Sequence, residues 1–514
     1  MLVRYATILG YFAILIVIGA LAAKRVRSLS DFFVGGKRLN YWVVAFSSRA
    51  TGESAWLLLG LTGLGATVGL SALWVVIGEL LGVGAAWFVL AKPFKIATDR
   101  YESITVIDYL GSRFREEPNS EARVLRLRAV AAIALACFVT IYVSAQIDAT
   151  GKAFEKFLDW NYFIGAIVGF AIVVAYTTTG GFTAVAWSDV FQGALMLVGL
   201  VVLPIAGWLA LPEGVSLREA ITAQDPAMLS WSGEGGWNLR NLLVIVSYVA
   251  IGLGFLGSPQ IFVRFISLRD SHEIAAGRWV ALAFTLLTDA AAVMAGVVGR
   301  CILVPVGAEL TQSLGNNGEH LLPALVEEVF PAFVVGLYIA AVLAAIMSTI
   351  DSLLVVAASA LTRDLYQQTY HSKLSQQHLT KLSRIVTVSL AVLALLIALG
   401  VAVSVPGRTV FWYVIFGWSG ITATFCPMII LSLMWPRYNS VGACASMIVG
   451  MLCVPVFKFV VPELGELGAT VAVAEELAPS FVLSLLAGIT ATWATSYRIR
   501  SKIPKCEESV SNSG

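Results

Sequence analysis

Apolar stretches of about 18 or more residues recur along almost the whole chain, and no other feature constrains the fold as strongly. Each stretch is long enough to cross a hydrocarbon core of about 30 Å as an α-helix. The 514 residues are 58% hydrophobic and only 13% charged, and the mean hydropathy of +0.84 lies outside the range of soluble globular proteins. We therefore expect an all-α integral membrane protein.

The length criterion predicts about thirteen transmembrane helices. Their expected centres are Leu15, Leu59, Gly82, Phe138, Gly169, Leu195, Gly254, Ala291, Ala344, Val392, Gly420, Ile448 and Ala487. The longest polar connections, near 95–128 and 211–240, have about 30 residues and are too short to fold as domains. No separate soluble domain is expected.

The basic residues predict the orientation in the membrane, because cytoplasmic loops carry an excess of Lys and Arg. Most of the 34 Lys and Arg fall in segments that would share one side. These are Lys24, Arg25, Arg27, Lys37, Arg38, Lys92 to Arg128, Arg264, Arg269, Arg278, Arg363, Lys373, Lys381, Arg384, Arg437, Arg498, Arg500, Lys502 and Lys505. We expect a multi-pass plasma-membrane protein with its N-terminus outside and its C-terminus in the cytoplasm. The net charge of +2 gives no reason to expect a nucleic-acid partner.

Two expected spans, the second (41–69) and the seventh (241–267), are interrupted by Gly, Ser, Thr or Pro. In the seventh, three glycines and Pro259 weaken a continuous helix. Broken helices at matching places are typical of transporters built from two inverted repeats, in which freed backbone groups bind substrate and ion at the midplane. The expected parts are a first helix and loop (1–40), a first repeat (41–211), a second repeat (212–436), two further helices (437–498) and a short tail (499–514).

Arg49 and Glu53 lie inside the first interrupted span, in the stretch SSRATGESAW, where a bilayer normally excludes full charges. If the helix stays wound, residues four apart share one face and the two charges pair. Alternatively the segment unwinds at Thr51 and Gly52, and Glu53 faces a water-filled cavity with Arg49 as its counter-ion or as a gate. The residues alone leave both interpretations open.

A strip of oxygen-bearing side chains follows Ala345 in the ninth expected span. Ser348, Thr349, Asp351 and Ser352 lie within about two turns of one helix. Hard monovalent cations need several oxygen ligands and few fixed charges, which hydroxyls and carbonyls supply. The alternative is that the hydroxyls bond back to carbonyls of their own helix, although a carboxylate at this depth still needs a partner.

Other polar residues interrupt the apolar spans. Asp189 begins the sixth span, where the helix dipole favours a carboxylate, and Gln146 and Asp148 lie in the fourth. Glu79 and Asp289 are interpreted as structural hydrogen-bonding groups. The sequence contains no metal-ligand spacing, phosphate loop or nucleophile motif, so neither an enzyme nor a cofactor is expected.

Several of these stretches resemble the sodium/solute symporter family, and most closely its sodium/proline branch. The matching pieces are DFFVGGKRL, ESAWLLLGLTG, CFVTIYVSAQ, TTTGGFTAVAWSDVFQG, GLGFLGSPQIFVRF, LAAIMSTIDSLLVVAASALTRDLY and GWSGITATFCPMIILSLMW. The resemblance extends over nearly the whole chain. It implies a transporter fold of five plus five helices, here spans two to six and seven to eleven.

The resemblance also implies binding residues. The sodium site of the family would fall on main-chain carbonyls of Ala50 and Glu53 and on Ala345, Ser348 and Thr349. A second sodium site of some members would map to Asp189, Asp351 and Ser352, with a carboxylate at 351 in place of the usual hydroxyl. The residues at the positions that face the solute are Ser54, Trp56, Tyr142, Ile251, Phe255, Ser258, Pro259 and Gln260.

The expected solute wall departs from that of the proline transporters, which resemble one another in having Gly, Asp and Met where this chain has Arg49, Gly52 and Glu53. Their Trp, Tyr, Gln and His correspond to Ile251, Phe255, Ser258 and Gln260, whereas Ser54, Trp56, Tyr142 and Pro259 match. The frame of the sodium site is therefore largely retained, and the wall that faces the solute is altered.

We expect a symporter that couples sodium influx to uptake of a small organic solute, with proline or a related amino acid first. Its expected partners are the solute, sodium as the coupling ion, and the lipid bilayer. One alternative is proton coupling through Glu53 and Asp351. Another is a sensor on the same fold that binds a solute without carrying it.

Overall fold

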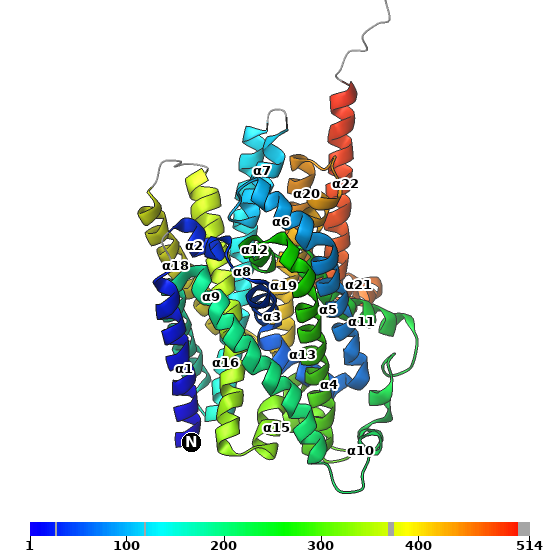
Figure 1. Ribbon diagram of the computed structural model, residues 1–514. Coiled ribbons are helices and arrows are strands. Elements are labelled where there is room, and N and C mark those ends of the chain that lie inside the picture. Colours follow the sequence, from blue (N-terminus) through cyan, green and yellow to red (C-terminus); the bar gives the residue numbers. More distant parts are fainter. Residues whose placement is uncertain (26–27, 118–119, 369–374, 502–514) are drawn as a thin grey trace, which may run out of the picture.

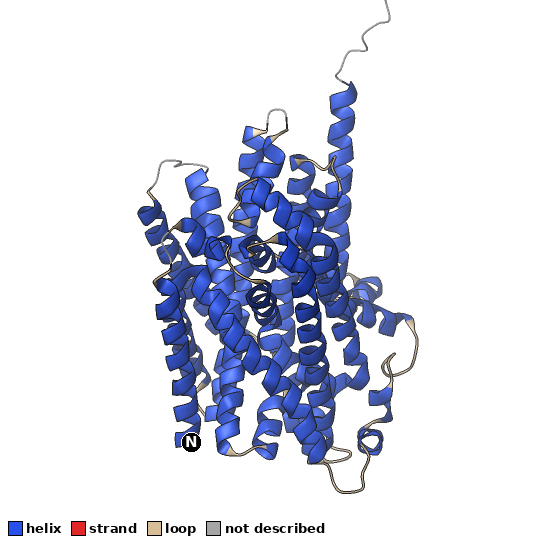
Figure 2. Cartoon of the chain, in the orientation of Figure 1, coloured by secondary structure: helices blue, strands red, loops and turns tan. Residues whose placement is uncertain are grey.

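The computed structural model describes residues 1–25, 28–117, 120–368 and 375–501. Within these residues the regular secondary structure is helical (Figures 1 and 2). An isolated β-bridge joins Leu39 and Leu268, and the described residues form no sheet. The first half contains α1 (Leu2–Ala23), α2 (Leu29–Val34), η1 (Gly35–Lys37), α3 (Tyr41–Ala55), η2 (Trp56–Leu61), α4 (Thr62–Val68), η3 (Gly69–Ala72), α5 (Leu73–Ala85), η4 (Ala86–Leu90), α6 (Ala91–Arg100), α7 (Val106–Arg115), α8 (Glu121–Leu158), α9 (Tyr162–Leu209), α10 (Leu217–Gln224) and η5 (Pro226–Leu229). The second half contains α11 (Leu239–Ala250), η6 (Ile251–Leu256), α12 (Pro259–Ser267), η7 (Ser271–Glu273), α13 (Ile274–Leu303), α14 (Leu310–Leu314), η8 (Asn316–Gly318), α15 (Leu321–Val329), α16 (Ala332–Ser359), η9 (Ala360–Gln367), α18 (Gln376–Ser404), α19 (Val410–Met434), α20 (Ser440–Pro455), η10 (Val456–Val460), η11 (Val461–Glu463), α21 (Gly465–Ala472) and α22 (Leu477–Ser501).

Eleven helical stretches of the described chain are long and apolar enough to cross a membrane. The second and third expected spans run together as the stretch Tyr41–Arg100, and the fifth falls in the shorter apolar helix Tyr162–Ala175. The all-helical membrane fold is therefore confirmed, whereas the count of thirteen stays a prediction. Of the expected tail 499–514, residues 502–514 lie outside the described chain.

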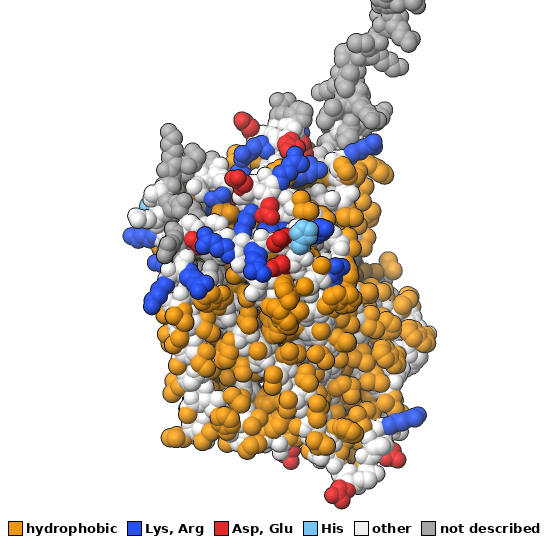
Figure 3. Space-filling model, viewed as in Figure 1, with side chains coloured by type: hydrophobic (Ala, Val, Ile, Leu, Met, Phe, Trp, Pro, Cys, Tyr) orange, Lys and Arg blue, Asp and Glu red, His pale blue; other side chains and the backbone are white. Residues whose placement is uncertain are grey.

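The long helices run roughly parallel, and the molecule has an apolar belt with charged residues gathered mainly at one end (Figures 1 and 3). Residue 1 lies at the end with few charges, and α22 extends beyond the charged end. An orange band of apolar side chains between the two ends is the surface that a bilayer would cover.

The second expected span is broken, but at a different residue from the one expected. The helix α3 stays wound through Thr51 and Gly52, and the departure comes at Ser54, with φ 46° and ψ −166°, after which η2 continues as a wide turn. The expected unwinding at Thr51 and Gly52 is therefore wrong by two to three residues. A serine in this positive-φ conformation is uncommon and typical of a functional position.

The seventh span is broken where its glycines and proline predicted. The helix α11 ends at Ala250, the tighter helix η6 covers Ile251–Leu256, and α12 restarts at Pro259, whose ring suits the first helical position. Glycines let η6 pack directly on α5: a Cβ at Gly252 would lie 1.9 Å from the carbonyl oxygen of Gly78, and a Cβ at Gly82 would lie 1.9 Å from that of Gly252. Main chain therefore meets main chain at this crossing.

The broken helix α3 lies at the centre of the molecule, with every residue from Ser47 to Ala55 buried. It packs against four other helices, α9, α12, α13 and α16. The helix α9 supplies the fifth and sixth expected spans and bends at Gly181, whose φ of 58° a glycine adopts without strain. Segments far apart in the sequence are thus brought to the two breaks.

Candidate functional site

The hydroxyl strip of α16 meets the main chain of α3 just before its break. Ser348 Oγ donates to the carbonyl oxygen of Ala50 at 2.9 Å, and Thr349 Oγ1 donates to that of Thr51 at 3.0 Å. Both hydroxyls also lie 3.1 Å from the carbonyl oxygen of Ala345, which precedes Ser348 by three residues and Thr349 by four on α16. Two hydroxyl oxygens and three carbonyl oxygens therefore converge between the two helices.

Four of the five expected sodium ligands take part in this meeting, namely Ala50, Ala345, Ser348 and Thr349. The fifth differs, because the carbonyl of Glu53 accepts the N–H of Trp56 and the hydroxyl of Thr349 reaches Thr51. Neutral oxygens of this kind suit a weakly charged hard cation, and each hydroxyl could rotate to present a lone pair in place of its proton. The donor set fits sodium as a transported ion.

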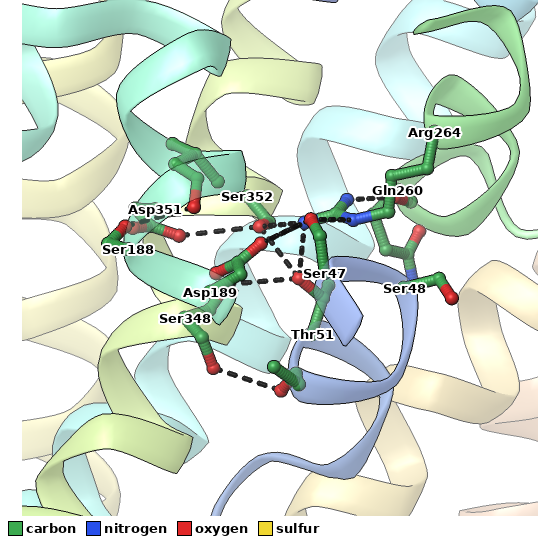
Figure 4. Close-up of polar contacts among 12 residues, drawn as sticks. Ser47, Ser48, Thr51, Ser188, Asp189, Gln260, Arg264, Ser348, Asp351 and Ser352 are labelled. Carbon is green, nitrogen blue, oxygen red and sulfur yellow. Dashed lines mark hydrogen bonds and ion pairs between the residues drawn. The ribbon is translucent and has the colours of Figure 1, made fainter. Parts of the chain in front are cut away.

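Asp189 and Ser352, expected at a second cation site, share a guanidinium (Figure 4). Arg264 Nη2 lies 2.8 Å from Asp189 Oδ2 and 2.7 Å from Ser352 Oγ, and it also donates to Thr51 Oγ1. Its Nε donates to Ser47 Oγ at 2.8 Å, and its Nη1 donates to the carbonyl of Gln260. Ser352 Oγ lies 3.3 Å from Asp351 Oδ1, so the third expected residue adjoins the same group. We call Arg264, Ser47, Thr51, Asp189 and Ser352 the Arg264 cluster.

The position of Arg264 corrects the sequence analysis, which counted this residue among the basic residues on the cytoplasmic side. Its side chain is fully buried and forms an ion pair with Asp189 between α12 and α9. Asp189, likewise, is not a simple helix-start acid, because it is buried inside the span Gly181–Leu209. A buried carboxylate in an apolar span needs a cationic partner, and this requirement was the signal that could have found Arg264.

Polar groups of α8 bind the break in α3. Gln146 accepts the N–H of Ala55 at 3.1 Å and donates to Ser54 Oγ at 3.2 Å, while Tyr142 Oη donates to the same hydroxyl at 3.4 Å. Trp56 Nε1 donates to the carbonyl of Gly52 at 3.2 Å. Three expected solute-facing residues, Ser54, Trp56 and Tyr142, are thus brought together, and Gln146 joins them.

The other expected solute-facing residues surround the break after η6. Trp418 of α19 donates to the carbonyl of Ile251 at 2.9 Å, and its ring lies 5.2 Å from that of Phe255 and 6.3 Å from that of Tyr142. Ser258 lies beside Cys426 at 3.8 Å, and Pro259 begins α12. The amide of Gln260 is buried, and neither its nitrogen nor its oxygen has a partner among the described residues.

Arg49 and Glu53 form the i,i+4 ion pair that a wound helix predicts, with Nη2 of Arg49 2.8 Å from Oε1 of Glu53. Other polar side chains contact this pair. Arg49 Nη2 also lies 2.8 Å from Glu79 Oε2 of α5. Thr288 of α13 donates to Glu53 Oε1 at 3.0 Å and lies 3.1 Å from Asp289 Oδ1. We call Arg49, Glu53, Glu79, Thr288 and Asp289 the Arg49 cluster. Glu79 and Asp289 are therefore more than separate hydrogen-bonding groups, because Glu79 shares the guanidinium of Arg49 with Glu53 and Asp289 lies beside the same Thr288 hydroxyl as Glu53.

A second set of polar contacts lies near Trp56, around the start of α19. Phe411, at the start of α19, packs edge-on against Trp56 with ring centroids 6.1 Å apart, and Val410 donates its N–H to Glu319. Lys152 of α8 lies 3.0 Å from the Glu319 carboxylate, and Arg408 pairs with Asp148. Burial raises the pKa of Glu319 above its ordinary value, and Lys152 opposes that rise.

Comparison with known proteins places the chain in a family. A model of the sodium:solute symporter family matches residues 32–450. The chain belongs to the sodium:solute symporter family. Among its relatives are the osmoregulated proline transporter OpuE of Bacillus subtilis (strain 168), 31% identical with 95% of each chain covered, and the high-affinity proline transporter PutP of the same organism, 34% identical with 85% of this chain and 88% of the relative covered. The sodium/proline symporter of Escherichia coli (strain K12) is 30% identical over 91% of this chain and 88% of the relative.

Solved structures agree on the fold of this sodium:solute symporter. A Na+-coupled sialic acid symporter, described in a substrate-bound outward-open state with a novel Na+ site, superposes with a TM-score of 0.76 at 20% identity, covering 96% of this chain and 97% of the other. MhsT in complex with L-phenylalanine gives a TM-score of 0.51 at 15% identity, covering 88% and 98%. The predicted family, the transporter fold and the assignment as a transporter and not an enzyme are thereby confirmed.

Proposed function

We propose that this sodium:solute symporter carries proline or a closely related amino acid into the cell, driven by sodium. The chain is proposed to lie in the plasma membrane with its N-terminus outside and its charged end in the cytoplasm. That orientation agrees with the gathering of Lys and Arg at one end (Figure 3). The two inverted repeats, residues 41–211 and 212–436, are proposed as the units that move.

The single observation that carries the proposal is the convergence of Ser348 and Thr349 on the carbonyls of Ala50 and Thr51. In a bilayer, hydroxyls and carbonyls that face each other across two helices can replace the hydration shell of sodium. The site lies beside the break at Ser54, whose hydroxyl is in reach of Tyr142 and Gln146. Sodium and solute would therefore bind next to each other.

The names of the relatives support proline or a related amino acid as the solute, because several of them are called proline transporters or sodium/proline symporters. The residues Ser54, Trp56 and Tyr142 resemble theirs. The remaining wall, formed by Ile251, Phe255, Ser258 and Gln260, differs. A related amino acid is therefore as consistent with the wall as proline itself.

Binding of both ligands between the broken helices would favour closure, and movement of one repeat against the other would then open the site to the cytoplasm. The Arg264 cluster links α12 to α3, α9 and α16, so its hydrogen bonds would have to rearrange as these helices move. The work comes from the ion gradient, of which the membrane potential alone supplies about 2.3 kcal/mol per charge per 100 mV.

Uptake by the purified protein in proteoliposomes tests the proposal. A panel of labelled amino acids and other small solutes is offered with an inward sodium gradient, with a pH gradient in its place, and with neither. Uptake of proline or a relative that depends on sodium is the expected result. Uptake driven by the pH gradient without sodium would instead support proton coupling, and binding without counterflow would support a sensor.

A further inference from the structure

The Arg49 cluster contains more carboxyl groups than cationic groups. Glu53 and Glu79 each lie 2.8 Å from Arg49 Nη2, and Asp289 faces Glu53, Glu79 and Arg49. All four side chains are 0–1% exposed, so water does not screen them. Two carboxyl groups thus contact one guanidinium and a third lies beside them, in the interior of a membrane protein where isolated charge is costly. One guanidinium can balance only one full negative charge.

Several buried polar atoms of the cluster have no hydrogen-bond partner among the described residues. They are Arg49 Nε and Nη1, Glu53 Oε2 and Asp289 Oδ2. The Thr288 hydroxyl lies 3.0 Å from Glu53 Oε1 and 3.1 Å from Asp289 Oδ1, and its single proton can bond one of them at a time. A buried carboxyl oxygen without a protein donor needs a partner such as water, an ion or a ligand. The two carboxyl groups that carry the free oxygens therefore lie beside the same hydroxyl.

The cluster adjoins the expected solute wall. Glu53 immediately precedes Ser54, where α3 breaks, and Arg49 lies over the ring of Phe255 at 4.5 Å. Phe255 in turn packs on Trp418, and a Cβ at Gly52 would meet the Phe255 ring at 2.7 Å. Phe255 therefore contacts both Arg49 of the cluster and Trp418 of the expected solute wall.

We infer that Glu53 and Asp289 bind the positively charged nitrogen of the transported solute, through Glu53 Oε2 and Asp289 Oδ2. This inference rests on the proposed function and deepens it, because it requires a solute that carries an ammonium or quaternary nitrogen. Arg49 and Thr288 act as positioning residues, since Arg49 Nη2 orients Glu53 and the Thr288 hydroxyl lies between the two carboxyl groups. Carboxyl oxygens without a protein donor favour a positively charged group as their partner.

An inorganic ion is a poorer match for the same atoms. A bound metal needs oxygens aimed at one point, whereas Glu53 and Glu79 each direct an oxygen to the guanidinium of Arg49. Over the described residues, no group of three or more His, Cys, Asp or Glu is arranged to hold a metal ion. A solute ammonium can instead donate N–H groups to both oxygens, and a quaternary nitrogen can bring its positive charge beside them without a hydrogen bond.

Pairs of probes that differ only in the charged nitrogen test the inference on the full-length protein. L-Proline is compared with tetrahydrofuran-2-carboxylate, glycine betaine with 3,3-dimethylbutanoate, and L-alanine with L-lactate. Each probe competes with sodium-driven uptake in proteoliposomes, and its binding is measured by thermal shift in sodium and in potassium chloride. For the pair that contains the carried solute, the charged member should bind at least about tenfold more tightly, the equivalent of one charge-assisted hydrogen bond.

Substitutions then assign the preference to the two carboxylates. Glu53→Gln and Asp289→Asn should each reduce the ratio between charged and uncharged members towards one. Asp148→Asn is the matched control, because Asp148 is equally buried and ion-paired with Arg408 but lies outside the cluster; it should keep the wild-type ratio. If Glu53→Gln does not fold, Asp289→Asn carries the test, since Asp289 makes no direct ion pair with Arg49 within the described residues.

Three results would overturn the inference while leaving sodium symport intact. The ratio could be unchanged in Glu53→Gln and Asp289→Asn, or the carried solute could lack a cationic nitrogen. Sodium alone could also stabilise the wild type but neither variant, which would assign the cluster to the inorganic ion. Failure of every solute to move with sodium would instead contradict the proposed function itself.

Discussion

Two guanidiniums are buried beside the broken helix α3, and their surroundings differ. Arg264 is bonded through all three of its nitrogens, mostly to neutral oxygens, and has one carboxylate partner, Asp189. Arg49 is bonded through Nη2 alone within the described chain, yet three carboxyl groups face it. Arg264 is bonded through every nitrogen and holds helices together, whereas the unbonded nitrogens and additional carboxyl neighbours of Arg49 suit the ligand contact inferred above.

The largest expected effect comes from removing Arg49, because this side chain contacts two buried carboxyl groups and lies near a third. Arg49→Met should lower the free energy of unfolding by more than about 5 kcal/mol, above the usual range for breaking one buried ion pair. Thermal unfolding of the purified protein and its yield in the membrane measure the loss. Arg300→Met is the control, since Arg300 donates to the neutral carbonyls of Ala66 and Thr67. Equal losses of unfolding free energy in Arg49→Met and Arg300→Met would contradict the special role of the carboxyl groups around Arg49.

Removing Arg264 should cost less, because only one carboxylate then loses its partner. Arg264→Met is expected to lower the free energy of unfolding by about 3–5 kcal/mol. Adding Asp189→Asn should recover part of that loss, since the amide no longer leaves a charge unpaired. Both variants are followed by thermal unfolding. A double variant no more stable than Arg264→Met alone would contradict the ion pair as the main contribution of Arg264.

The hydroxyls that adjoin the Arg264 cluster on α16 should affect sodium and not stability. Ser348→Ala together with Thr349→Ala should raise the sodium concentration for half-maximal uptake by about tenfold, as expected for losing two modest ligand contacts. Ser446→Ala with Ser484→Ala is the control, because these hydroxyls bond each other between α20 and α22. An unchanged sodium dependence in the first variant would count against the assigned site.

The smallest expected effect concerns the rings under the two guanidiniums. Phe255 lies 4.5 Å from Arg49 and Phe182 lies 5.5 Å from Arg264. Phe255→Leu should destabilise the protein by about 1 kcal/mol more than Phe182→Leu, since the closer ring interacts more strongly with its cation and Arg49 has fewer hydrogen bonds. Thermal unfolding of the two variants checks the order. The reverse order would mean that packing and not cation attraction dominates at these rings.

The sequence predicted those parts of the structure that depend on local composition. Long apolar runs placed the membrane helices, and the glycines with Pro259 placed the seventh break, because both are properties of a segment by itself. The proximity of Ala50 and Ser348 was predicted from the family resemblance and not from their spacing in the sequence. The break in α3 was displaced to Ser54 because its position depends on bonds from Gln146 and Tyr142, which lie far away in the sequence.

Ion pairs between residues far apart in the sequence were harder to predict. Arg264 follows a motif near the end of an apolar span and looks like any basic residue at a membrane surface, so its pairing with Asp189 required the packing of α12 on α3 and α9. Arg49 and Glu53 were expected as a pair from their spacing, but the joining of Glu79 and Asp289 depends on how α5 and α13 pack. A count of charges within the apolar spans does contain a warning, since these four residues include one base and three acids.

The crossing of η6 on α5 has a consequence for how such carriers diversify. Its closest contacts run between the backbones at Gly78, Gly82 and Gly252, so the docking geometry does not depend on the side chains at 251, 255, 258 or 260. Substitutions can therefore change the side chains that face the solute while the packing of η6 on α5 stays the same. The same independence makes the glycines themselves intolerant, because even one added methyl group would drive the two segments apart.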